Sequence, residues 1–113
     1  MSAPALNLST ALRPAILAHL QSCLPEEGCG LIGGLPGQGT LWLAIPNELH
    51  STTAFRMQPQ PMLDALQFFA QQGLELVAIC HSHPCGPLWP SPQDQAAFAY
   101  PGVWTVIAAP TQR

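Results

Sequence analysis

The segment His-Ser-His-Pro at residues 81–84, followed after six residues by Ser-Pro-Gln-Asp at 91–94, constrains this chain more than any other feature. Histidines at positions i and i+2 of an extended segment project from one face, so His81 and His83 can bind the same ion. Asp94 can supply a third ligand from the start of a following helix. Three protein ligands leave one position of a tetrahedral zinc open, which is typical of a catalytic site.

The same residues also have ordinary structural interpretations. Ser91 is a good N-cap, Pro92 a good first helical residue and Asp94 a good capping-box carboxylate, so 91–94 is also typical of a plain helix start. A single histidine at a strand end is more often a hydrogen-bonded polar residue that binds no metal ion. The coincidence of a histidine pair, this helix start and an acidic residue upstream favours zinc binding over these interpretations.

The spacing His-x-His-Pro, six residues, Ser-x-x-Asp resembles the signature of the JAMM (MPN-domain) zinc metallopeptidases. The family pattern also has a glutamate two residues before a Cys-Gly pair and a hydrophobic strand, and residues 25–33 match it. The resemblance implies that Glu27, and not Glu26, is the general base. It further implies that Ser91 donates a hydrogen bond to the developing oxyanion and that zinc is held by His81, His83 and Asp94.

Composition excludes several other kinds of protein. At 113 residues, 48% of them hydrophobic, the chain is expected to form one domain, 1–113, with a core of its own. It contains no lysine, so a P-loop, a Schiff-base lysine and a lysine-rich nucleic-acid surface are all excluded. The net charge of −3 also argues against a nucleic-acid partner.

The chain termini and cysteines bear on where the protein works. Residues 1–6 lack the basic and apolar regions of a signal peptide, and no apolar run approaches membrane-spanning length. We therefore expect a cytoplasmic protein with no membrane partner and no need for disulfides. A closed four-cysteine zinc site is the competing idea, but the cysteines lack the tight Cys-x-x-Cys spacing. They are Cys23, Cys29, Cys80 and Cys85.

Hydrophobic periodicity and turn residues predict a series of elements. The expected helices are one capped by Ser9 or Thr10 and ending before Pro25, one from Pro61 to Gly73, and a short one at 91–100. The expected strands, with a glycine-rich turn at 33–39, are 6–8, 29–32, 40–45, a short one around Phe55 and Met57, 76–80 and 103–108.

This order predicts an α/β fold in which helices pack on a single mixed sheet. The family resemblance implies the three-layer, cytidine-deaminase-like sandwich of the MPN domain. Domains of that family usually continue beyond the last strand expected here, so the sheet should have an unpaired edge. A second copy of the chain can cover such an edge, and we therefore expect that the chain can form a homodimer.

Three functional hypotheses follow. The first is a zinc-dependent hydrolase of amide bonds; the resemblance implies that its substrate is a ubiquitin-like or sulfur-carrier protein with a C-terminal Gly-Gly. The second is a non-catalytic protein-binding scaffold of the same fold, which intact candidate ligands argue against. The third, more distant, is a purely structural zinc domain.

Overall fold

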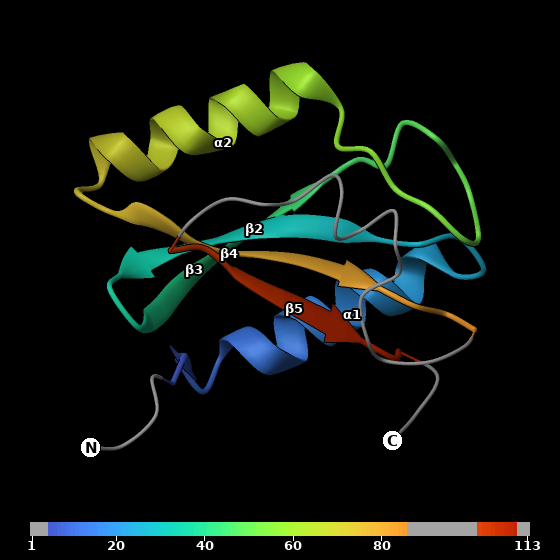
Figure 1. Cartoon of the computed structure of the whole chain (residues 1–113), viewed down its shortest axis with the longest axis horizontal. Helices are drawn as coiled ribbons and strands as arrows, with labels where there is room; N and C mark the ends of the chain where they lie inside the picture. The colour runs from blue at the N-terminus through green and yellow to red at the C-terminus, as the bar shows by residue number, and fades with distance from the viewer. Residues whose placement is uncertain (1–4, 86–101, 111–113) are drawn as a thin grey trace.

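In the computed structural model, which describes residues 5–85 and 102–110, a five-stranded mixed sheet lies between two helices (Figure 1). The strand order is β1-β3-β2-β4-β5. Helix α1 covers one face and α2 the other, which confirms the predicted α/β class and its three layers. The elements are β1 (Asn7–Leu8), α1 (Leu12–Cys23), β2 (Cys29–Leu35), β3 (Gln38–Ile45), α2 (Pro59–Gln71), β4 (Glu75–Ser82) and β5 (Trp104–Ala108).

Strands β2 and β3 form an antiparallel hairpin whose turn is tighter than predicted. Gly33 and Gly34 belong to β2, and the left-handed residue of the turn is Gly37, with φ of 76°. A Cβ at Gly33 would lie 2.6 Å from the ring of Phe69 on α2. Gly33 therefore allows close packing of helix on sheet, a role that sequence alone does not distinguish from a turn.

Helix α1 ends before Pro25 as predicted, but its predicted side-chain cap is wrong. Ala11 is the N-cap residue, and neither Ser9 nor Thr10 caps the helix through its side chain. The backbone N–H of Leu12 instead donates to the carbonyl of Ser9, at 2.9 Å. Burial of the apolar face of α1 against the sheet holds the helix in place.

The two faces of the sheet carry separate apolar layers. Helix α1 packs with one set of strand residues, including Ile32 and Cys80, and α2 packs with another, including Leu31 and Ile79. The segment predicted as a short strand around Phe55 and Met57 makes only an isolated bridge, from Met57 to Asn47, yet its two apolar side chains are buried in the α2 layer.

Strand β4 is the element that leads into the site. It pairs antiparallel with β2 and parallel with β5, so its residues from Val77 onward are buried on both faces, as its apolar sequence predicts. Helix α2 begins two residues earlier than predicted, at Pro59. The predicted helix at 91–100 lies outside the described residues. Among the described residues, neither helix is long and apolar enough to cross a membrane.

Substitutions at two adjacent phenylalanines on α2 test the packing of this helix on the sheet. Phe69 is 1% exposed and Phe68 is 41% exposed. Phe69→Ala should lower the free energy of unfolding by about 3–5 kcal/mol, because it leaves a cavity between α2 and β2. Phe68→Ala is the matched control and should cost less than about 1 kcal/mol. Urea unfolding measures both, and equal losses would contradict the packing described here.

Candidate metal centre

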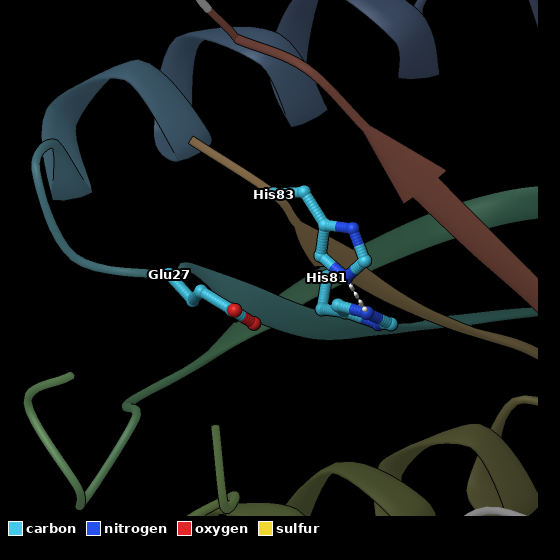
Figure 2. Close-up of side chains that lie close together, drawn as sticks. All are labelled: Glu27, His81 and His83. Carbon is cyan, nitrogen blue, oxygen red and sulfur yellow. Dashed lines mark hydrogen bonds between the residues drawn. The ribbon is translucent and has the colours of Figure 1, made fainter. Parts of the chain in front are cut away.

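The register between β2 and β4 places three candidate residues together. Cys29 pairs with His81 in the antiparallel ladder. Continuing this register by two residues brings Glu27 opposite His83, and residues directly opposite have Cβ atoms about 4.5–5.5 Å apart. Side chains two residues apart share a face, so Glu27, His81 and His83 all lie on the face that α2 covers (Figure 2).

The two imidazoles point their Nε2 atoms at each other. These atoms lie 3.1 Å apart, and the ring centroids are 4.9 Å apart (Figure 2). His81 is fully buried and stacks on Phe55, with centroids 4.4 Å apart and planes 23° from parallel. The backbone N–H of His83 donates to the carbonyl of Ala108 on β5, at 2.9 Å. The His81 ring is therefore held by packing, and the backbone of His83 is held by the neighbouring strand.

Glu27 completes the group. The residue is 4% exposed. Its side chain extends from just before β2 toward the imidazoles (Figure 2). One ligand atom from each of Glu27, His81 and His83 lies within 4.8 Å of the others. Glu26, by contrast, points to the surface and pairs with the exposed His50, at 3.1 Å. The structure thus brings the second glutamate, and not the first, to the histidine pair.

The geometry of this donor set fits a metal ion. Two nitrogens that each lie about 2.0–2.1 Å from a tetrahedral zinc are about 3.3 Å apart, close to the separation of the two Nε2 atoms. Imidazole and carboxylate are ordinary ligands of transition metals. Within the described residues, this is the one group of three or more such side chains close enough to share an ion. The predicted ligand Asp94 and the predicted oxyanion donor Ser91 lie outside those residues.

The structure also reveals supporting residues that the sequence reasoning missed. The hydroxyl of Ser82, between the two histidines, accepts a hydrogen bond from the Gly28 N–H at 2.8 Å, and the Ser82 N–H donates to the Gly28 carbonyl at 2.9 Å. Asn47 donates to the Glu27 carbonyl at 3.0 Å. An apolar Phe55 inside a polar stretch was the available signal that the segment 47–57 is packed.

The cysteines do not form a second centre. All four are free thiols. Cys29 lies in the α2 layer and Cys80 in the α1 layer, on opposite faces of the sheet, so they cannot bind one ion together. Burial raises the pKa of the Cys80 thiol to about 12. Burial, with smaller contributions from the thiols of Cys23 and Cys80 and from Glu27, raises the pKa of Cys29 to about 12 as well. Both thiols stay protonated at neutral pH.

The fold is a mixed sheet between two helices, and two buried histidines and a glutamate meet where β2 begins and β4 ends. This arrangement defines an MPN-like domain with a candidate metal site. The chain belongs to the prokaryotic JAB-domain family, whose model, described as prokaryotic homologs of the JAB domain, matches residues 9–113. This confirms the resemblance found in the sequence.

Two relatives are similar in sequence. One, from Thermus thermophilus, is described as a probable TtuB-protein conjugate cleaving protease, and is 42% identical over 78 residues, 68% of this chain and 52% of the relative. The other, from Pyrococcus furiosus, is described as a desampylase, and is 35% identical over 82 residues, 72% of this chain and 59% of the relative. The matches therefore span little more than half the length of each relative.

Solved structures show the same fold. A protein from Desulfitobacterium hafniense is 27% identical with a TM-score of 0.83, and the match covers 95% of this chain and 76% of that one. A JAB1/MPN domain protein from Archaeoglobus fulgidus is 22% identical with a TM-score of 0.62, with coverage of 92% and 78%. The likeness to the second supports the fold alone.

The reactivity of the four cysteines tests the burial of Cys29 and Cys80. At pH 8, iodoacetamide should modify the exposed Cys85 first and the half-buried Cys23 more slowly, because the reagent reaches an exposed sulfur more readily. The thiolate is the reactive form, and burial keeps Cys29 and Cys80 protonated. Cys29 and Cys80 should react at least about 100-fold more slowly than Cys85 until the protein unfolds. Mass spectrometry of peptides gives the rates. Rapid modification of Cys29 or Cys80 in the folded protein would contradict their burial as neutral thiols.

Proposed function

We propose that the protein is a zinc-dependent metallopeptidase. The observation that carries this proposal is the convergence of Glu27, His81 and His83 in a buried site, in a chain that belongs to the prokaryotic JAB-domain family. A scaffold or a structural domain has no need for a buried carboxylate beside two candidate zinc ligands, whereas zinc-dependent hydrolysis needs a base beside an open metal position.

The proposed zinc ligands are His81, His83 and Asp94, the last assigned from its spacing in the sequence. Their side chains suit zinc because they combine two neutral imidazoles with one carboxylate. When bound, zinc supplies Lewis acidity, which lowers the pKa of water toward 7 and polarises a carbonyl. The packing of His81 on Phe55 holds the His81 ring, and the backbone bond from His83 to β5 positions the residue that carries the second imidazole.

In the proposed mechanism Glu27 is the general base. It accepts the proton of the attacking water and returns it to the leaving amine, a role that requires a carboxylate within hydrogen-bond reach of the water. Its position beside the histidine pair supports this role, and its burial excludes bulk water that would compete for the proton. Ser91 is proposed to donate a hydrogen bond to the oxyanion that develops on the scissile carbonyl.

The proposed substrate is the C-terminal tail of a ubiquitin-like or sulfur-carrier protein. The description of the Thermus thermophilus relative as cleaving protein conjugates supports this choice. A tail that ends in Gly-Gly carries no side chains beyond Cα, so it can lie extended in a narrow site next to buried residues. With a net charge of −3 and no lysine, the chain favours docking by apolar and hydrogen-bonding contacts.

The ligand assignment predicts how metal content responds to substitution. The purified protein should contain about one zinc per chain, and His81→Ala, His83→Ala and Asp94→Ala should each deplete it. His50→Ala is the matched control, because His50 lies at the surface and pairs with Glu26, and it should retain zinc. Elemental analysis measures all four variants. Full zinc occupancy in all three ligand variants would disprove the assignment.

Cleavage of carrier fusions tests the activity. A folded ubiquitin-like carrier with a short extension after Gly-Gly should be cut after the second glycine, and the same fusion without Gly-Gly should not. Glu27→Gln should keep its zinc and lose about 10²–10⁴-fold in rate, because the proton acceptor is gone. Glu26→Gln is the control and should stay near the wild-type rate. Mass spectrometry measures the products.

Two results would contradict the proposal. Zinc binding without cleavage of any carrier or conjugate would favour the non-catalytic scaffold. A near wild-type rate for Glu27→Gln would show that another residue accepts the proton.

A further inference from the structure

Asn47 lies just after β3 and is buried, and its side-chain amide makes four hydrogen bonds. Its Nδ2 donates to two carbonyls, that of Glu27 at 3.0 Å and that of Ala54 at 3.1 Å. Its Oδ1 accepts from two backbone N–H groups, those of Leu49 and Arg56, both at 3.1 Å. An amide side chain offers two donors and two acceptor sites, and all four are used here.

This arrangement also fixes which way the amide faces. If the oxygen and nitrogen of Asn47 were exchanged, an acceptor would face two carbonyl oxygens and a donor would face two N–H groups. Only the observed orientation satisfies the four partners. The side chain therefore acts as a rigid link between the segment 47–57 and the backbone of Glu27.

The segment 47–57 forms hydrogen bonds with both backbone polar groups of Glu27, its N–H and its carbonyl. Glu27 precedes β2, which begins at Cys29, so its own N–H and carbonyl take no part in the sheet ladders. Its N–H donates to the carbonyl of Ser51 at 2.8 Å, and its carbonyl accepts from Asn47. The same segment carries Phe55, which stacks on His81. This one segment thus contacts both Glu27 and His81.

We propose that Asn47 is a positioning residue that sets where the Glu27 carboxylate lies relative to the two histidines. This inference rests on the proposed role of Glu27 as general base. Asn47 does not touch the reacting atoms; it acts by fixing the backbone from which the carboxylate extends. A displacement of about 1 Å in a catalytic group can cost about 10²-fold in rate, so a link of this kind has a measurable effect.

Two substitutions test the link. Asn47→Asp keeps the size and one acceptor oxygen but places an acceptor against the carbonyls of Glu27 and Ala54. Asn47→Ala removes the link without adding a buried charge, and it keeps the test available if the aspartate is not tolerated. Both should lower kcat by about 10²-fold with little change in KM or in zinc content. Thr52→Ala is the control, because Thr52 is an exposed residue of the same segment, and it should leave kcat unchanged.

A double-mutant cycle separates positioning from general stability. If Asn47 acts through Glu27, then Asn47→Ala should cost less than about 3-fold in the Glu27→Gln background, although it costs about 10²-fold in wild type. Equal losses in both backgrounds would overturn the proposal. Failure of the proposed function itself would look different, since Glu27→Gln alone would then be as active as wild type.

A second measurement does not depend on activity. In the metal-free protein, amide hydrogen exchange at Glu27 should be at least about 10-fold faster in Asn47→Ala than in wild type, because the backbone loses the link beside its bond to Ser51. Thr52→Ala should leave this exchange rate unchanged. Wild-type exchange at Glu27 in Asn47→Ala would also overturn the proposal.

Discussion

The antiparallel pairing of Cys29 with His81 is the constraint on which the site depends. It fixes the register of β2 against β4, and a slip of one residue would turn both histidines to the opposite face of the sheet. Burial enforces the register, because His81 shares its face with the α2 layer and Cys80 shares its face with the α1 layer. The same apolar layers that stabilise the fold therefore decide which side chains meet at the metal site.

Local patterns in the sequence predicted much of this arrangement. The apolar run ending at residue 80 predicted a buried strand that leads into His81, and the family resemblance, which places a glutamate two residues before the Cys-Gly pair, pointed to Glu27. Both signals lie within a few residues of the feature they predict. One prediction that was wrong depended on a distant residue: Gly33 lies in β2, not in the turn, and leaves room for Phe69 on α2, which no local pattern of glycines reveals.

The same reasoning applies to the segment 47–57, in which only a short strand around Phe55 and Met57 was predicted. It is irregular, but Asn47 satisfies four backbone groups within and beside it, and Phe55 buries its ring against His81. Its order comes from one side-chain network and one aromatic contact, neither of which has a periodicity. A site built partly by such a segment can be located from its ligands, while its supporting residues become visible only in three dimensions.

The central claim is that the metal is held by the two imidazoles that the β2–β4 register brings together, completed by oxygen ligands, while the buried thiols take no part. X-ray absorption spectroscopy of the zinc-loaded protein tests this most directly. We predict nitrogen or oxygen neighbours at about 2.0–2.1 Å, with the outer scattering pattern of two imidazoles and no sulfur neighbour. A sulfur neighbour at about 2.3 Å, or the loss of imidazole scattering, would contradict the account.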